Sequence, residues 1–79
     1  MIEFDNNAVG AVIRKLRKTK KMSQEVLSGL TGLARSHLSM IENGEKHPNF
    51  ETIWRIANTL EISPHELVQA IEDQIKRKK

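Results

Sequence analysis

The side chains best suited to hydrogen-bonding chemistry lie in the segment 35–43, which reads RSHLSMIEN. Arg35 carries a guanidinium that can bond the O6 and N7 atoms of guanine together. Leu38 and Ile41 are three residues apart and would share the buried face of a helix. The same helix would turn four side chains toward base edges in the major groove of DNA: Arg35, Ser36, Ser39 and Met40. Serines can bond several bases or a phosphate, and Met40 could contact a thymine methyl, so Arg35 is the strongest candidate for base recognition.

Basic side chains close to this segment are candidates for contacts with DNA phosphates. These candidates are Lys18, Lys21, His37 and Lys46. Basic residues at the end of a helix are also favoured by the helix dipole alone, and His37 can equally lie at a helix edge without touching phosphate. The formal net charge of +3 agrees with a polyanionic partner but does not require one.

Two short helices would position these side chains. Ser23 can cap the first of them by accepting a bond from a backbone N–H. Helical spacing predicts that this first helix turns one stripe inward, formed by Leu27, Leu30 and Thr31. Gly32 permits a left-handed backbone between the two helices. The second helix should run from about Arg35 to Asn43, because the dipeptide Asn43-Gly44 is a strong stop signal.

The remaining segments also follow helical spacing. Asp5 or Asn6 can cap a helix that ends at Lys20-Lys21, and Asn49 can cap a later one. The dipeptide Ser63-Pro64 opens a capping box that continues to Glu66, so a last helix should run from Pro64 to about Lys76. The apolar stripes of these three helices are Val9, Val12, Ile13 and Leu16; Ile53, Ile56, Ala57 and Leu60; and Leu67, Val68, Ile71 and Ile75.

No segment alternates with the period of a β-strand. The sequence therefore predicts an all-α fold, a compact five-helix domain with a helix-turn-helix formed by its second and third helices. One domain should span residues 1–79, with its core in 8–70 and a basic tail at 76–79.

The chain resembles the Cro/lambda-repressor-like helix-turn-helix proteins, also called the XRE family. The similarity lies in Met22-Ser-Gln-Glu-x-Leu27, in Gly32, in Leu38-Ser-x-Ile-Glu-Asn-Gly44, in Pro48 and in Ile56-Ala-x-x-Leu60. It covers about residues 8–70, and the size is similar to that of small stand-alone members such as restriction–modification controller proteins. The resemblance implies a lambda-repressor-like fold and a transcription regulator, such as a repressor, whose third helix enters the major groove of double-stranded DNA.

The resemblance also assigns roles to single residues. Gln24 and Asn43 match family positions that contact the DNA backbone. Arg17 and Glu42 match a pair that the family joins by a salt bridge between the first and third helices, so Glu42 is expected to be structural rather than catalytic.

The sequence departs from the family pattern at several positions. Ala34 occupies the place of a capping Ser, Thr or Asp, a loss of about 1 kcal/mol. Glu45 places a negative charge in a loop expected near phosphate. Ser28 and Thr31 stand where alanines often pack, so their hydroxyls must bond nearby backbone carbonyls.

A single helix-turn-helix reads few base pairs, so a homodimer on a palindromic operator is expected. Surplus apolar residues predict its interface: Trp54, Val68, Ile71 and Ile75. The alternative for Trp54 is that it only covers the core. Val26 and Leu30 could form a second small patch, for a partner such as RNA polymerase, although such pairs are often incidental.

Other classes of protein are disfavoured. The chain has no cysteine for disulfides or thiolate metal sites, and its three histidines fall in separate segments. No nucleophile–base spacing or Gly-rich phosphate loop is present, so neither an enzyme nor a cofactor, metal or small-molecule ligand is predicted. No apolar run approaches the roughly 20 residues of a membrane span, and acidic residues interrupt the N-terminus, which predicts a cytoplasmic protein. The competing function is a protein-interaction module, an antitoxin or adaptor, built on the same helices.

Overall fold

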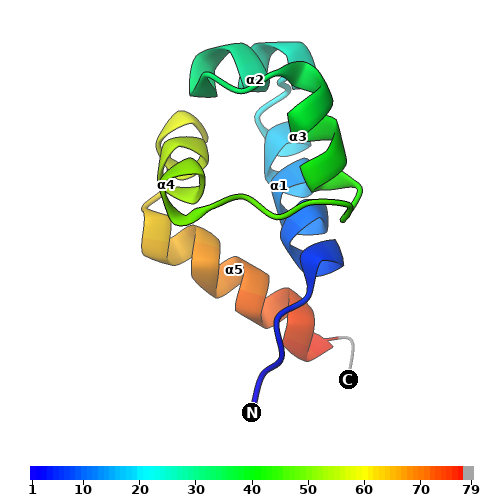
Figure 1. Ribbon diagram of the computed structural model, residues 1–79. Helices are drawn as coiled ribbons and strands as arrows, with labels where there is room; N and C mark the ends of the chain where they lie inside the picture. Colours follow the sequence, from blue (N-terminus) through cyan, green and yellow to red (C-terminus); the bar gives the residue numbers. More distant parts are fainter. Residues whose placement is uncertain (78–79) are drawn as a thin grey trace.

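The computed structural model describes residues 1–77, and the predicted tail residues Lys78 and Lys79 lie outside this range. Within it the chain forms five α-helices and no strand, which confirms the all-α prediction. The helices are α1 Asn6–Thr19, α2 Gln24–Thr31, α3 Arg35–Glu42, α4 Phe50–Thr59 and α5 Pro64–Arg77. Figure 1 shows α2 at one end of the molecule and α5 at the other, with α1, α3 and α4 between them.

Side-chain caps begin most of these helices at the predicted residues. Asp5 accepts a bond of 2.9 Å from the backbone N–H of Asn7, Ser23 one of 3.0 Å from Val26, and Asn49 one of 2.8 Å from Thr52. At the start of α5 the backbone N–H of Ser63 donates to the Glu66 carboxylate at 2.9 Å. These bonds satisfy N–H groups that have no partner within the helix. Ala34 supplies no such bond to α3, as expected from its methyl side chain.

Left-handed residues end four of the helices. Two are the glycines expected from the sequence, Gly32 with φ +76° and Gly44 with φ +81°. The other two are Lys21 with φ 57° and Glu61 with φ 63°. After each of the four, the next backbone N–H bonds back to a carbonyl in the last turn of the helix. The sequence did not reveal Lys21 and Glu61, because residues with a Cβ rarely adopt this conformation.

A single apolar core joins all five helices. The predicted stripes supply most of it, and Val68 is the exception on α5, since its side chain is 46% exposed. The inward stripe predicted for α2 was wrong at Leu30, which is 65% exposed. Ser28 lies inward instead, beside Leu27 and Thr31, because α2 packs on both α3 and α4 and buries the side between them.

The buried hydroxyls on α2 bond as expected. Thr31 donates to the backbone carbonyls of Leu27 and Ser28 at 2.8 and 3.1 Å, and Ser28 donates to the carbonyl of Glu25 at 3.1 Å. These bonds remove the cost of burying an unpaired hydroxyl.

The backbones of two helices approach closely where α1 crosses the end of α3. A Cβ atom at Gly10 would lie 2.4 Å from the backbone carbonyl oxygens of both Ile41 and Glu42. Glycine therefore lets the two backbones meet, and this contact fixes α3 against α1. Among the described residues no helix is both long and apolar enough to cross a membrane.

Candidate nucleic-acid interface

The outer face of α3 carries the predicted base-reading side chains with different degrees of exposure. Arg35 and Ser36 are exposed, whereas Ser39 and Met40 are partly buried. The following loop folds back on the end of α3, where the backbone carbonyl of Met40 accepts bonds from the N–H groups of Glu45 at 2.9 Å and Lys46 at 3.3 Å. The two exposed members of the predicted base-reading set therefore lie in the N-terminal turn of α3. Leu38 and Ile41 are fully buried and hold the opposite face in the core.

The N-terminal residues of α2 lie beside that turn. A polar hollow is lined by Arg17, Ser23, Gln24, Glu25 and Arg35. The hollow brings two predicted DNA-contact residues, Gln24 and Arg35, to one place, although they come from different helices. Backbone N–H groups at the start of a helix favour an anion, so a phosphate beside Gln24 would be stabilised.

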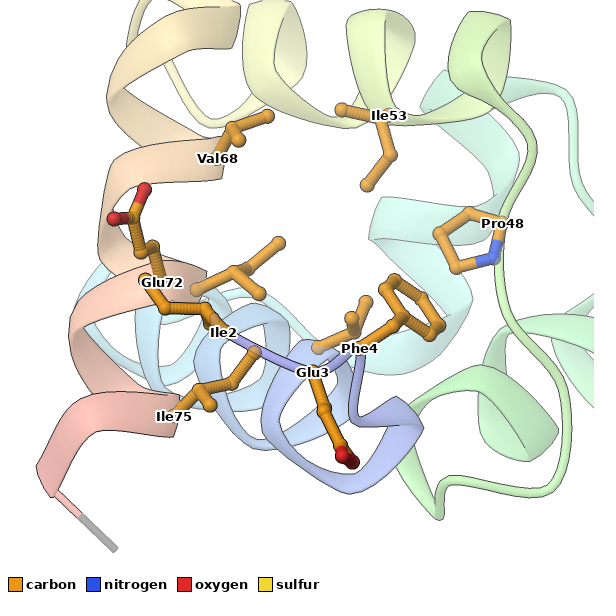
Figure 2. Close-up of a pocket in the computed structure, with 10 residues that line it drawn as sticks. Ile2, Glu3, Phe4, Pro48, Ile53, Val68, Glu72 and Ile75 are labelled. Carbon is orange, nitrogen blue, oxygen red and sulfur yellow. The ribbon is translucent and has the colours of Figure 1, made fainter. Parts of the chain in front are cut away.

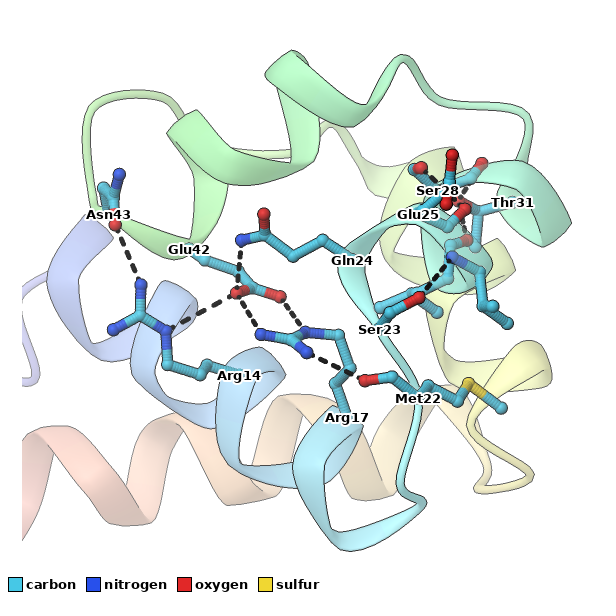
Figure 3. Close-up of polar contacts among 12 residues, drawn as sticks. Arg14, Arg17, Met22, Ser23, Gln24, Glu25, Ser28, Thr31, Glu42 and Asn43 are labelled. Carbon is cyan, nitrogen blue, oxygen red and sulfur yellow. Dashed lines mark hydrogen bonds and ion pairs between the residues drawn. The ribbon is translucent and has the colours of Figure 1, made fainter.

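The carboxylate of Glu42, at the end of α3, is the centre of a polar network that joins three helices (Figure 3). Arg17 binds it through two parallel bonds, from Nε to Oε2 at 2.7 Å and from Nη2 to Oε1 at 3.0 Å. Gln24 donates to Oε1 at 3.0 Å, and Arg14 donates to the same atom at 3.5 Å. A further bond of 2.8 Å runs from Arg17 to the carbonyl of Met22. The network ties α1 and α2 to the C-terminal turn of α3.

The electrostatics of this network keep Glu42 ionised. Burial of its side chain raises the pKa of the carboxyl, but the bonds from Arg17 and Gln24 and the charge of Arg17 outweigh burial, so the pKa lies below its ordinary value. The bond with Glu42 likewise raises the pKa of Arg17, although burial opposes this change. Since bidentate bonds from a guanidinium are among the strongest in proteins, the pair is a rigid connection.

Asn43, a predicted phosphate contact, belongs to the same assembly. Its side-chain oxygen accepts a bond of 2.9 Å from Nη2 of Arg14. Arg14 was not among the residues that the sequence singled out. The available signal was its spacing of three residues from Arg17, which puts both side chains on the same side of α1.

The remaining phosphate candidates are spread around this region. Lys18, Lys21 and Lys46 are exposed, and His37 is partly buried. Lys20, next to Lys21, pairs with Glu61 at 3.0 Å and so connects the turn after α1 to the turn after α4.

The predicted dimer residues divide into two groups. Trp54 and Val68 are 48% and 46% exposed, whereas Ile71 and Ile75 are each 8% exposed and belong to the core. Beside Val68 an apolar hollow of about 370 Å³ opens between α4, α5 and the N-terminal segment. Figure 2 shows Val68 and Ile53 on one side of it and Ile2 and Phe4 on the other. Ile71 and Ile75 line the same hollow.

Two other features bear on whether the protein binds a protein partner or a metal ion. Val26 and Leu30 are both exposed on α2, as an apolar patch for a partner would require. Among residues 1–77 there is no group of three or more His, Cys, Asp and Glu side chains placed to hold a metal ion.

Comparison with known families gives one clear match. The profile of the helix-turn-helix family HTH_3 matches residues 13–67. Among relatives, the ImmF control region 10 kDa protein of Bacillus phage phi105 is 33% identical over 74 residues, which cover 89% of this chain and 82% of that protein.

Two solved structures are similar in both sequence and fold. The restriction-modification controller protein C.AhdI from Aeromonas hydrophila is 37% identical with a TM-score of 0.75, and the match covers 78% of this chain and 94% of the controller. The controller C.Esp1396I, solved as a tetramer on its natural 35 base-pair operator, is 29% identical with a TM-score of 0.81. That match covers 92% of this chain and 96% of the controller.

Proposed function

This chain belongs to the HTH_3 helix-turn-helix family of transcriptional regulators, and on that basis we propose that it binds a palindromic operator as a homodimer, with α3 in the major groove. Arg35 would read guanine, Ser36 and Ser39 would bond nearby base edges or phosphates, and Met40 would meet a thymine methyl. The similar controller C.Esp1396I, solved on its operator, supports duplex DNA as the partner.

The observation that carries the proposal is the asymmetry of α3. Its N-terminal turn exposes Arg35 and Ser36, while its C-terminal turn is fixed by the Glu42 network. A groove-reading helix needs this combination, because contacts with base edges give discrimination only when the helix is held in register. Gln24 and Asn43, on either side of the network, would supply that register by bonding phosphates.

Selection of bound sequences from a random duplex pool tests base reading. The wild-type protein should enrich a palindrome with a defined guanine in each half-site, and Arg35→Ala should lose that preference, with a cost of roughly 1–3 kcal/mol per half-site. Arg55→Ala is the matched control, since Arg55 is exposed on α4 and pairs with Glu51. An unchanged guanine preference in Arg35→Ala would remove Arg35 from the groove.

Pairing of two copies would place their reading helices about 34 Å apart, one turn of DNA. We assign the interface to the apolar surface around Trp54 and Val68, with the hollow lined by Ile71 and Ile75 at its centre. Val68→Asp is the suitable test, because a substitution at Ile71 would also disrupt the core. Val68→Asp should convert a dimer to a monomer in sedimentation, whereas Leu30→Asp, an equally polar change at an exposed apolar residue, should leave the dimer intact. A dimer in both variants would contradict this assignment.

The exposed pair Val26 and Leu30 supports a second candidate, a protein-interaction module (an antitoxin or adaptor) that uses the same fold. In a regulator, the same pair could instead contact a protein such as RNA polymerase. A titration of duplex binding against salt separates the candidates, because neutralised phosphates release counterions. Strong salt dependence with sequence enrichment supports the regulator, and weak binding of all duplexes without enrichment supports the interaction module.

A further inference from the structure

Arg14 is an exposed cation placed at the end of the reading helix. Its side chain is 44% exposed, whereas the side chains of Arg17 and Glu42 are 10% and 0% exposed. Its Nη2 group donates to Asn43, and its Nε donates to Glu42 at the longer distance of 3.5 Å. These two bonds use one side of the guanidinium, which has five N–H groups in all. The remaining N–H groups are left for a ligand.

Hydrogen-bond chemistry fixes the orientation of the Asn43 amide. A guanidinium has donors and no acceptor, so only the oxygen of Asn43 can face Arg14. Figure 3 shows this arrangement, with the amide nitrogen of Asn43 turned away from Arg14. The two N–H groups on that nitrogen therefore point out of the pair. Arg14 and Asn43 thus present donors side by side.

Helical spacing places Asn43 on the outer face of α3. It is seven residues from Ser36 and four from Ser39, so these three side chains follow one another along the same face. A groove that receives the N-terminal turn of α3 would bring a DNA strand close to Asn43 at the other end of the helix. The pair therefore lies where a backbone phosphate is expected.

An anion can bind at this position only if a cation lies beside it. The C-terminal end of a helix carries partial negative charge, and Glu42 adds a full negative charge there. Two guanidinium groups surround this one carboxylate, so the cluster has a surplus of one positive charge. The bidentate bonds with Glu42 neutralise the charge of Arg17, so the surplus positive charge lies on exposed Arg14. Asn43 is uncharged and lies at the negative end of α3, so Arg14 supplies the positive charge that attracts an anion there.

We propose that Arg14 and Asn43 form a phosphate-binding pair that clamps one backbone phosphate at the C-terminal end of α3. Asn43 supplies a directed amide donor, and Arg14 supplies the charge and sets the orientation of that amide. This inference rests on the proposed binding of duplex DNA. It adds a cation on α1 to a contact that otherwise depends on α3 alone.

The test is the salt dependence of duplex binding for wild type, Arg14→Gln, Arg14→Lys and Asn43→Ala, using the duplex that the wild-type protein selects. Each neutralised phosphate contributes about 0.9 to the slope of log affinity against log salt concentration. Arg14→Gln should lower the slope by about 0.9 per protomer and weaken binding roughly tenfold per protomer. Arg14→Lys should keep the slope because it keeps the charge, and Asn43→Ala should weaken binding with no change of slope.

Lys15→Gln is the matched control, because it removes the same charge from the adjacent exposed position of α1 and should keep the wild-type slope. Urea unfolding of each variant verifies folding, which Arg14→Gln should retain, since Glu42 keeps its bonds with Arg17 and Gln24. An unchanged slope in Arg14→Gln would overturn the proposal, even if affinity fell, because Arg14 would then only orient Asn43. Failure of the wild-type protein to bind any duplex would instead contradict the proposed function itself.

Discussion

The stability of the fold should depend sharply on which helical glycine acquires a methyl group. Alanine in place of glycine inside a helix normally stabilises by about 1 kcal/mol, because glycine loses more backbone freedom on folding. Gly10 in α1 and Gly29 in α2 are both helical, but only Gly10 faces another backbone. At Gly29 a Cβ atom would have no neighbour within 4 Å. Gly29→Ala should therefore gain about 0.5–1 kcal/mol in the free energy of unfolding.

At Gly10 the same change should destabilise the protein. The new Cβ would lie 2.4 Å from two carbonyl oxygens, about 1 Å short of an ordinary contact, so α1 and α3 must separate by a similar distance. That movement would stretch the Arg17–Glu42 bonds of 2.7 and 3.0 Å beyond useful length. Overpacking costs about 1–3 kcal/mol and loss of a buried pair about 3–5 kcal/mol. After the helix gain and partial relaxation, Gly10→Ala should lose about 2–4 kcal/mol.

Urea unfolding followed by circular dichroism measures both variants against wild type at one protein concentration, because dimerisation would add to apparent stability. The informative quantity is the difference between the two alanine variants, since helix propensity cancels in it. If Gly10→Ala proved as stable as Gly29→Ala, the contact between α1 and α3 would be adjustable and would not hold α3, the proposed reading helix, in one position.

Two further variants probe the network and the turns. The pKa of Glu42 in the folded protein lies below its ordinary value of 4.5. As the pH falls, the unfolded chain therefore takes up the proton first. The stability that Glu42 confers is thus present above pH 4.5 and is lost as the pH falls below it. Glu42→Gln should be less stable than the wild-type protein at neutral pH. Urea unfolding at several pH values should show that the difference in the free energy of unfolding between the two proteins becomes smaller in acid. A difference that stays constant with pH would contradict the lowered pKa of Glu42. Lys21 has the left-handed backbone that suits glycine, so Lys21→Gly should raise the free energy of unfolding by about 0.5–1 kcal/mol. If Lys21 also contacts phosphate, the same variant should bind duplex DNA more weakly, and a binding titration beside the unfolding curve would reveal that opposite change.

Local signals in the sequence were sufficient to predict a helix boundary where a single residue forms the cap or the turn. Ser23, Asn49 and Gly32 each act within a few residues of their position, so the helix boundaries followed from them. Leu30 was misplaced because an eight-residue helix has too few turns to define its inward side, which depends on where α3 and α4 pack. The charged left-handed residue Lys21 was missed because its conformation is imposed by the Schellman-type turn after α1 rather than by its own preference.

The site was less predictable because it is assembled from distant segments. The ion pair of Arg17 with Glu42 entered the prediction through resemblance, and nothing in the spacing of 25 residues would otherwise join them. Gly10 gave no signal, since a glycine within a helix usually reads only as a weaker helix. Its meaning depends on the backbone of α3, which the sequence does not place. Arg14 was hidden among neighbouring basic residues that the helix dipole already accounts for.

The position of α3, the proposed reading helix, is determined at the end farthest from its proposed base contacts. With eight residues and no side-chain cap at Ala34, α3 would be marginal alone, so its geometry must come from neighbours. A well-packed apolar pair in place of both Arg17 and Glu42 could hold α3 against α1 with equal stability, because buried ion pairs gain little over such packing. It would not orient Gln24, whose amide is directed by the carboxylate, and it would leave Arg14 without one of its two anchors. The carboxylate is therefore explained by orientation more than by stability: one buried charge aligns donors from α1 and α2 around the end of α3.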